Sequence, residues 1–125
     1  MRKYLLTSIF VLIPILLFAD NYYGKRIGID NGLSQASVTC ITYNDDGALW
    51  IGTRFGLNEY SNGKIINFTK EKYGLSGCCI NGLFCSPKDN TLWVSSERGL
   101  HTFDSNKGVF HSISSEPTNC VLEHN

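Results

Sequence analysis

The residues of this chain that could do chemistry are few, and their spacing matches no catalytic pattern. Ser34 and Ser76 each follow a Gly-Leu pair, but no G-x-S-x-G sequence surrounds either hydroxyl, so neither is expected to be a nucleophile. Asp45 and Asp46 are adjacent, and neighbouring carboxylates give neither the opposed pair of a glycosidase nor enough oxygen ligands for calcium. We therefore predict no catalytic residue.

The thiol and imidazole groups show no metal pattern either. The five cysteines are an odd number, no C-x-x-C pair occurs, and His101 and His111 have no ligand spacing. Cys78 and Cys79 are adjacent and could bond to each other only with strain. We predict no metal and no cofactor, with most cysteines acting as small buried hydrophobes on strands. A metal site is the alternative.

An internal repeat defines the elements that must position these residues. Residues 32–69 and 74–112 carry the same anchors in the same order: Gly-Leu-Ser, Leu-Trp and Gly-Leu, each recurring 42 or 43 residues later. A period of about 40 to 45 residues is typical of a four-stranded propeller blade. The sequence therefore predicts an all-β fold of about two four-stranded β-propeller blades, which form an incomplete ring.

The strands expected in each blade are short β-branched and aromatic runs between turn residues. Blade 1 occupies about 32–69, blade 2 about 74–113, and a third blade is expected to start at about 118–125. The segment 22–29 has the pattern of one further outer strand. The expected strands are 38–43, 48–53, 57–60 and 64–69 in blade 1, and 80–85, 91–95, 100–104 and 109–113 in blade 2.

The repeated anchors are expected to be structural. Trp50 and Trp93 recur at equivalent positions, as residues packed between neighbouring sheets would, whereas residues that contact one ligand need not recur. A sugar-stacking platform is the alternative for these two side chains. The residues assigned to the structural blade motif are Trp50, Gly52, Gly56, Leu57, Trp93, Gly99 and Leu100.

The N-terminus has the pattern of a secretory signal peptide. Arg2 and Lys3 precede an apolar run at 4–18, and Ala19 could be the last residue removed. An uncleaved anchor or a buried apolar strand are alternatives. We predict that 1–19 is a signal peptide and that 22–125 is a partial propeller exported to the periplasm. With 11 basic and 11 acidic residues the net charge is zero, so no nucleic-acid partner is expected.

Two equivalent loops carry the candidate ligand contacts. Loops at one end of a scaffold commonly form its binding face. Arg54 and Phe55 lie between the second and third expected strands of blade 1, and Glu97 and Arg98 lie in the same loop of blade 2. These four residues are the candidate ligand-binding residues; a solvated turn is the alternative for the Glu97–Arg98 pair.

The repeat resembles a known family. The run LWIGT at 49–53, followed by Gly-Leu at 56–57, is similar to the repeat of two-component regulator propellers. The segment 29–35 is similar to the start of hybrid two-component sensors of Bacteroides-type bacteria. The resemblance covers roughly 22–125, and blade 2 departs from it because it has Ser-Ser where the family has Gly-Thr.

The resemblance implies a function in signal transduction. Such proteins are long, with a periplasmic sensor followed by a membrane helix, a histidine kinase, a receiver and a DNA-binding domain, and they sense oligosaccharides. We expect this chain to be a non-catalytic ligand-sensing segment of such a parent, and thus a truncated product or one part of a larger receptor. The expected partners are an oligosaccharide and further blades or other copies, with membrane contact only through the parent.

Two other functions stay open. A propeller can be a structural or protein-interaction module without a small-molecule ligand. The sequence at 44–50 also resembles the Asp-box turn of sialidases, so a glycoside hydrolase or lyase fragment is a third alternative.

Overall fold

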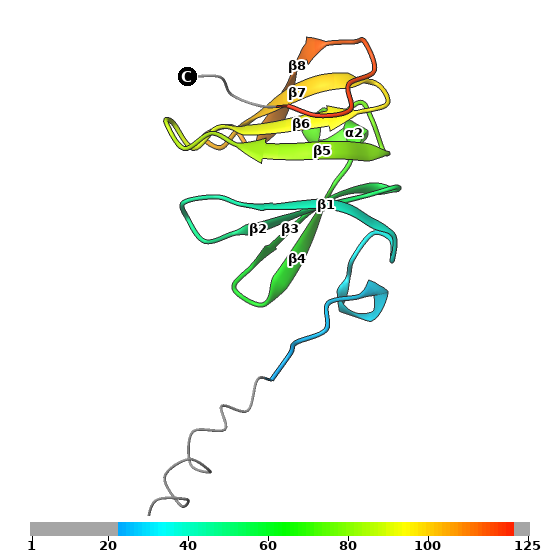
Figure 1. Ribbon diagram of the computed structural model, residues 1–125, viewed down its shortest axis with the longest axis vertical. Helices are drawn as coiled ribbons and strands as arrows, with labels where there is room; N and C mark the ends of the chain where they lie inside the picture. Colours follow the sequence, from blue (N-terminus) through cyan, green and yellow to red (C-terminus); the bar gives the residue numbers. More distant parts are fainter. Residues whose placement is uncertain (1–22, 122–125) are drawn as a thin grey trace, which may run out of the picture.

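Two antiparallel sheets, each of four strands, make up the regular structure of the computed structural model, which describes residues 23–121 (Figure 1). The first sheet contains, in sequence order, β1 (Val38–Tyr43), β2 (Leu49–Thr53), β3 (Gly56–Ser61) and β4 (Lys64–Phe68). The second contains β5 (Ile80–Cys85), β6 (Leu92–Ser96), β7 (Gly99–Asp104) and β8 (Val109–Ser114). The prediction of two four-stranded blades is confirmed, while the predicted signal peptide and residues 122–125 lie outside the described range.

Each observed strand begins and ends within one residue of its predicted limit, because turn residues mark those limits. Asn62 and Gly63, for example, form the two-residue loop between the paired residues Ser61 and Lys64. Their φ angles are 51° and 78°, and a loop of two left-handed residues suits the twist of the flanking strands. The strand predicted at 22–29 is wrong, since residues 23–28 carry no strand.

Two helical turns were not expected from the sequence. They are η1 (Ile29–Asn31) and α2 (Lys70–Tyr73), and both are too short to give a helical period of apolar residues. Each precedes the Leu-Ser of a repeat, and each ends at a left-handed glycine, Gly32 or Gly74. The turns therefore belong to the repeat and bring the chain back to the start of the next blade.

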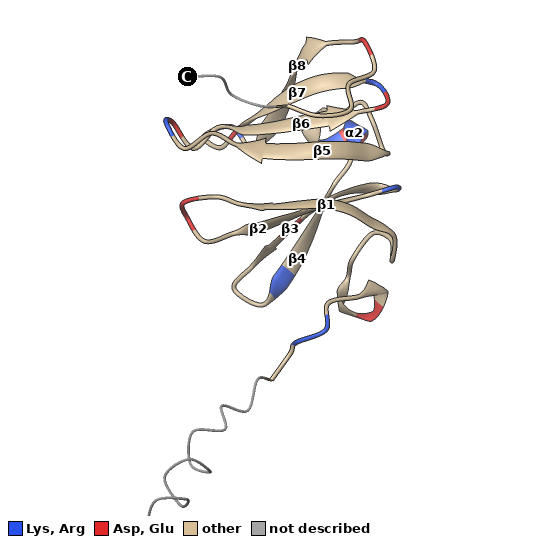
Figure 2. Ribbon diagram, in the orientation of Figure 1, with Lys and Arg blue, Asp and Glu red and all other residues tan. Residues whose placement is uncertain are grey.

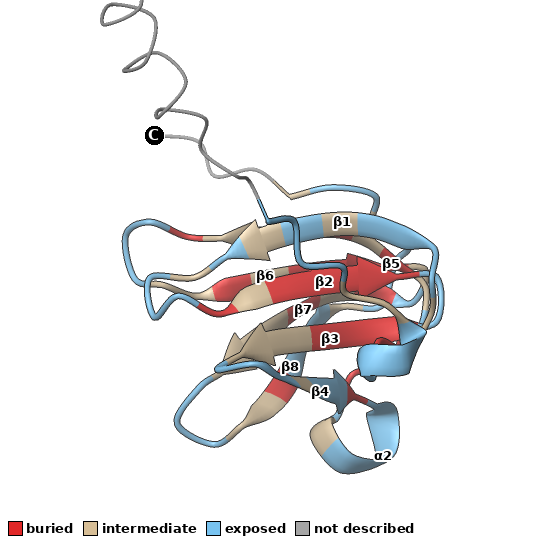
Figure 3. Cartoon of the chain, turned by 90° about the horizontal axis from the view of Figure 1, so that it is seen from below, coloured by how far each residue is buried: buried red, intermediate tan, exposed pale blue. Residues whose placement is uncertain are grey.

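The core lies between the two sheets, which face each other with β1 against β5 (Figure 1). Trp50 is 2% exposed, and its ring centroid lies 5.1 Å from that of Phe68 and 5.2 Å from that of Phe103. Figure 3 shows the buried stretches running through β2, β3 and β6, with exposed residues at the loops. The prediction that Trp50 packs between sheets is confirmed.

Trp93 differs from its counterpart in blade 1. It is only half-buried, because it lies opposite Thr102 on the face of the second sheet that is turned away from Trp50. No third sheet covers that face within residues 23–121. The two tryptophans thus occupy the same position of the repeat but have different surroundings in this structure.

Gly52 allows the two sheets to approach each other closely. A Cβ atom at this position would lie 2.5 Å from Cys40 Sγ and 2.7 Å from Ile80 Cγ2. Ile80 belongs to β5, so any side chain on residue 52 would push the blades apart at their inner strands. The glycine of the repeat is therefore a packing residue, as its assignment to the blade motif predicts.

The segment after β8 returns to the second sheet. The Thr118 N–H donates to the Ser96 carbonyl at 3.1 Å, and Asn81 Nδ2 donates to the Thr118 carbonyl at 3.0 Å. The start of a third blade here stays a prediction. Across the described range, no helix has the length and apolarity needed to cross a membrane.

Candidate functional site

The candidate site lies at the end of the sheets where the β2–β3 and β6–β7 loops meet the connection from β4 to β5. Antiparallel order brings these three segments to the same end, because each of them follows a strand that runs in that direction. Figure 2 shows a basic residue at the tip of the β2–β3 loop, basic and acidic residues together around α2 and the β6–β7 loop, and Asp at the β1–β2 turn of the opposite end. The β1–β2 turn is therefore acidic, whereas the loops at the candidate site carry both signs of charge.

A hollow of about 450 Å³ opens between the two blades at this end. Its floor includes Phe68 and Leu75, both buried, and Phe55 stands at its edge with 68% of its surface exposed. We call it the inter-blade hollow. The residues that line it are Phe55, Gly56, Phe68, Thr69, Lys70, Glu71, Leu75, Ser76, Gly77, Cys78 and Arg98.

The structure brings together two of the four predicted ligand-binding residues. Phe55 from the β2–β3 loop and Arg98 from the β6–β7 loop both line the inter-blade hollow. Arg54 is exposed and does not line it; its backbone N–H donates to the Ser37 carbonyl at 3.3 Å. The hollow also includes Lys70 and Glu71 of α2, which sequence reasoning missed because a single helical turn leaves no pattern.

Glu97, the fourth predicted residue, uses its carboxylate to hold the backbone. Its Oε1 accepts from the Cys78 N–H at 3.1 Å and its Oε2 accepts from the Cys79 N–H at 2.9 Å. Desolvation, and then the negative charge of Glu97, raise the pKa of the Cys78 thiol. Glu97 therefore positions the segment that forms one wall of the inter-blade hollow.

One hydroxyl in each blade positions the loop residue that lines the hollow. Thr53 Oγ1 accepts from the Phe55 N–H at 3.1 Å and donates to the Gly56 carbonyl at 2.9 Å. Ser96 Oγ does the same in blade 2, accepting from the Arg98 N–H and donating to the Gly99 carbonyl, each at 3.2 Å. The change from Gly-Thr to Ser-Ser thus preserves the hydroxyl, and Phe55 and Arg98 occupy equivalent places.

Comparison with known proteins identifies the repeat. A family model described as two component regulator propeller matches residues 32–55. Residues 32–55 of the first blade are therefore similar to the two-component regulator propeller repeat. The match spans the Gly-Leu-Ser segment, β1, β2 and the loop with Arg54 and Phe55, so one edge of the inter-blade hollow is built from this repeat.

Solved structures of two-component systems are also similar to this chain. The extracellular domain of a hybrid two component system from B. thetaiotaomicron is 29% identical, has a TM-score of 0.62, and matches over 70% of this chain and 13% of its own. A second such domain from the same organism is 27% identical, with a TM-score of 0.59 over 63% of this chain and 11% of its own. No curated protein matches this chain. The chain therefore spans about an eighth of the length of the extracellular domains that it resembles.

The serine of each Gly-Leu-Ser segment is held by a buried polar side chain on the third strand of its blade. In the propeller repeat of blade 1, the Ser34 N–H donates to Asn58 Oδ1, and Asn58 Nδ2 donates to Ser34 Oγ, both at 2.9 Å. In blade 2, Ser76 Oγ is hydrogen-bonded to His101 Nε2 at 2.5 Å. Asn58 and His101 are also 43 residues apart, and that spacing is the signal by which sequence analysis could have paired them.

Burial keeps His101 neutral. The residue is 0% exposed, and burial lowers the pKa of its imidazole below the usual 6.5. Among the described residues, its Nδ1 has no hydrogen-bond partner. His101 is thus a structural residue of the second propeller blade.

A second hollow lies at the opposite, acidic end of the seam, which is the boundary where the two sheets face each other. Asp46, Glu59 and Asp89 line it, and burial together with the charge of Asp46 raises the pKa of Glu59. Asn90 links the two blades here: its Oδ1 accepts from the Asp45 N–H at 2.9 Å, and its Nδ2 donates to Asp46 Oδ2 at 3.1 Å. No group of three His, Cys, Asp or Glu side chains within 23–121 has an arrangement suited to a metal ion.

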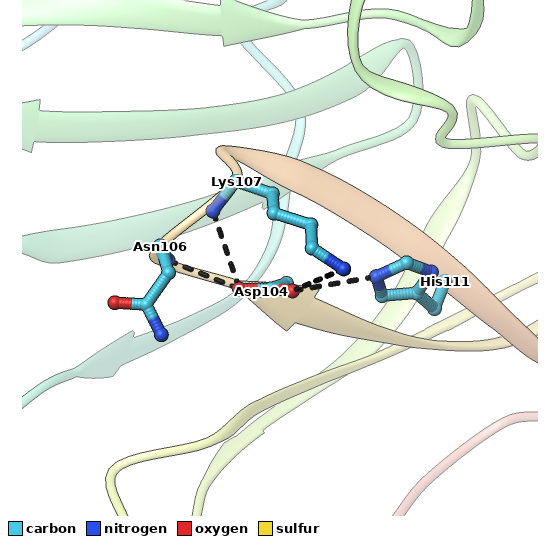
Figure 4. A network of polar contacts seen from close by, with 4 residues as sticks. All are labelled: Asp104, Asn106, Lys107 and His111. Carbon is cyan, nitrogen blue, oxygen red and sulfur yellow. Dashed lines mark hydrogen bonds and ion pairs between the residues drawn. The ribbon is translucent and has the colours of Figure 1, made fainter.

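The most connected carboxylate outside these hollows closes the β7–β8 hairpin (Figure 4). Asp104 Oδ1 accepts from the backbone N–H groups of Asn106 and Lys107 at 3.0 and 3.2 Å. Its Oδ2 lies 3.6 Å from His111 Nε2 and 3.8 Å from Lys107 Nζ. Desolvation opposes ionisation, but the hydrogen bonds from the Lys107 and Asn106 backbone and from His111, together with the charge of Lys107, outweigh it and lower the pKa of Asp104. This network is local to one hairpin, so we assign it to the fold.

The five cysteines form no disulfide in this structure. Cys40, Cys79 and Cys85 are half-buried, while Cys78 and Cys120 are exposed. The prediction that most thiols are buried on strands is therefore wrong: none of the five is fully buried, and only Cys40 and Cys85 lie on strands.

Proposed function

We propose that this chain is the ligand-sensing propeller segment of a two-component sensor, and that an oligosaccharide contacts it at the inter-blade hollow. The observation that carries the proposal is the placement of Phe55 and Arg98 at equivalent loops of adjacent blades, facing one hollow. An exposed aromatic ring beside hydrogen-bond donors is the usual means of holding a sugar, because the ring packs on C–H groups while the donors bind hydroxyls. Support for signalling comes from the similarity to extracellular domains of hybrid two component systems.

The proposed mechanism is binding without catalysis. The hollow is bordered by loops of both blades, so a ligand that touches Phe55 and Arg98 interacts with the two sheets together. Such a ligand stabilises one relative placement of the blades, and a longer exported parent protein transmits that preference to its signalling domain. The parent's membrane helix, kinase and further blades are part of the proposal.

The binding half of the proposal is tested by calorimetric titration of the full chain with a panel of oligosaccharides. We expect at least one to bind, and we expect Phe55→Ala to weaken its binding about tenfold, because a stacked ring contributes about 1 kcal/mol or more. Thr42→Ala, on an inner strand away from the hollow, serves as the control. If every oligosaccharide of the panel fails to bind, the carbohydrate-sensing proposal is wrong.

The signalling half is tested by determining the coding sequence downstream of Asn125. We expect further propeller repeats, a membrane helix and a histidine kinase in the same gene. If the downstream sequence encodes an adhesion domain or a hydrolase domain instead, the alternative of an interaction module or an enzyme fragment is correct.

A further inference from the structure

The charges of the inter-blade hollow point to the class of ligand. Lys70 and Arg98 line this hollow with a single carboxylate, Glu71, whereas three carboxylates and no Lys or Arg line the hollow at the opposite end of the seam. We infer that the inter-blade hollow binds an anionic oligosaccharide, one that carries carboxylate or sulfate groups. This inference rests on the proposed function and specifies its ligand.

The two cations of the hollow are available to a ligand. In the described part of the chain, neither Lys70 nor Arg98 forms an ion pair with a carboxylate. Glu97 is next to Arg98 in sequence, but its oxygens accept from the N–H groups of Cys78 and Cys79. Both residues are exposed at the hollow, and a cation there without a protein counter-ion favours an anionic ligand.

A hydrogen bond to Ser96 holds the backbone of Arg98 at the edge of the hollow. Ser96 holds the Arg98 N–H at 3.2 Å, so the side chain starts from a defined point at the edge of the hollow. A guanidinium group binds a carboxylate or a sulfate through two parallel N–H bonds, which gives orientation as well as affinity. Lys70, on the α2 side of the same hollow, adds a second positive charge, and its ammonium group can bind an anion from more directions than a guanidinium group can.

Phe55 favours a sugar over a simple inorganic anion as the expected ligand. Its ring is 68% exposed at the edge of the hollow, and the floor beneath is formed by Phe68 and Leu75. A small inorganic anion gains nothing from apolar surface, while a pyranose ring has an apolar face that packs on an aromatic side chain. One ring that stacks on Phe55 and directs its acidic group to Arg98 uses both features of the hollow.

The test uses matched pairs from the same oligosaccharide panel. The full chain is titrated with a trimer of galacturonic acid, with a sulfated galactose trimer, and with the neutral galactose trimer. We expect one of the charged trimers to bind at least tenfold more tightly than the neutral one in about 50 mM salt, and we expect the difference to shrink in 0.5 M salt because of screening. Whichever charged trimer binds more tightly shows whether the hollow prefers a carboxylate or a sulfate group.

Variants assign the preference to the hollow. Arg98→Gln is expected to lower affinity for the charged trimer about tenfold and to leave the neutral trimer unchanged, and Lys70→Gln to have a smaller effect in the same direction. Arg54→Gln is the matched control, since it removes the same charge from an exposed loop residue that does not line the hollow. Thermal unfolding of each variant verifies that the fold is kept.

Three results overturn the inference, and the first two leave the proposed carbohydrate site standing. If the neutral trimer binds as tightly as both charged ones, the ligand is not selected by charge, and the proposed carbohydrate site stands. If no trimer binds while another neutral member of the panel does, the inference also fails alone. If Arg54→Gln and Arg98→Gln lower the affinity for the charged trimer equally, the preference depends on the overall charge of the chain. The assignment of the anion to the inter-blade hollow would then be wrong.

Discussion

The two blades share their strand order and the hydrogen bonds of the β2–β3 and β6–β7 loops but differ in the side chains at equivalent positions. Thr53 and Ser96 make the same pair of hydrogen bonds in their loops, and yet the residues that they hold are Phe55 in one blade and Arg98 in the other. Trp50 and Trp93 likewise share a position, but only Trp50 is enclosed between sheets. The comparison teaches that the repeat fixes where a side chain is placed, while the blade's own sequence decides what it can bind.

The largest expected difference between the blades concerns the tryptophans. Trp50→Ala should reduce the free energy of unfolding by about 3 to 5 kcal/mol, because it leaves a cavity among Phe68 and Phe103. Trp93→Ala should cost clearly less, because Trp93 is only partly buried. Urea unfolding of the two variants measures both values. Equal losses would mean that the face of Trp93 is covered in solution.

A smaller effect is expected for the two loop hydroxyls. Thr53→Val should cost about 1 to 3 kcal/mol, since Thr53 is fully buried and its removal leaves the Phe55 N–H without its acceptor and takes one of two hydrogen-bond partners from Ser34 Oγ. Ser96→Ala should cost less, because Ser96 holds only the two bonds within its own loop. Thermal unfolding gives the order of stability. A larger loss for Ser96→Ala would contradict the account of the two loops.

The third prediction concerns His101, the buried side chain that is hydrogen-bonded to Ser76 in blade 2. Burial lowers the pKa of His101 in the folded chain, so the unfolded chain binds the proton more readily. Stability is therefore complete above about pH 6.5 and is lost as the pH falls toward the folded pKa, by up to about 1.4 kcal/mol per pH unit.

Replacing His101 with the residue found in blade 1 tests this assignment. His101→Asn should flatten the dependence of unfolding free energy on pH between about 5 and 7, and His111→Asn, at an exposed position, is the control. Denaturant titrations at several pH values measure it. A pH dependence that survives His101→Asn and disappears in His111→Asn would show that the Asp104–His111 contact is responsible.

The smallest effect is expected at the β7–β8 hairpin. Asp104→Asn keeps an acceptor for the N–H groups of Asn106 and Lys107 but removes the charge that faces His111 and Lys107. Because these partners are largely exposed, the loss should stay below about 1 kcal/mol and should fall further in high salt. Unfolding at two salt concentrations checks this, and a loss comparable to that of Trp50→Ala would contradict the local assignment of the network.

The sequence predicted the sheets well because the repeat and its turn residues act locally. The limits of β1 and β5 were predicted without error, and the loop positions of Phe55 and Arg98 followed directly from them. The partners across the seam could not be predicted in the same way. Lys70 enters the hollow through a single helical turn, and Glu97 bonds to backbone groups about 18 residues earlier; neither arrangement leaves a periodic signal.

The difference in charge between the two hollows could not be predicted from the sequence either. The chain's net charge is zero, so its composition gives no hint that Lys70 and Arg98 gather at one hollow while Asp46, Glu59 and Asp89 gather at the other. The separation depends on which turns lie at which end, and that becomes visible only when the two sheets are placed face to face.

The central claim is that a ligand binds at the seam between the blades, at the end formed by the β2–β3 and β6–β7 loops. Amide NMR spectra of the full chain, recorded during titration with the oligosaccharide that binds best, test it most directly. The account predicts that the shifts concentrate at Phe55, Lys70 and Arg98 and leave Asp46 and Asp89 unchanged. Shifts confined to the Asp46–Asp89 end, or spread over neither hollow, would contradict it.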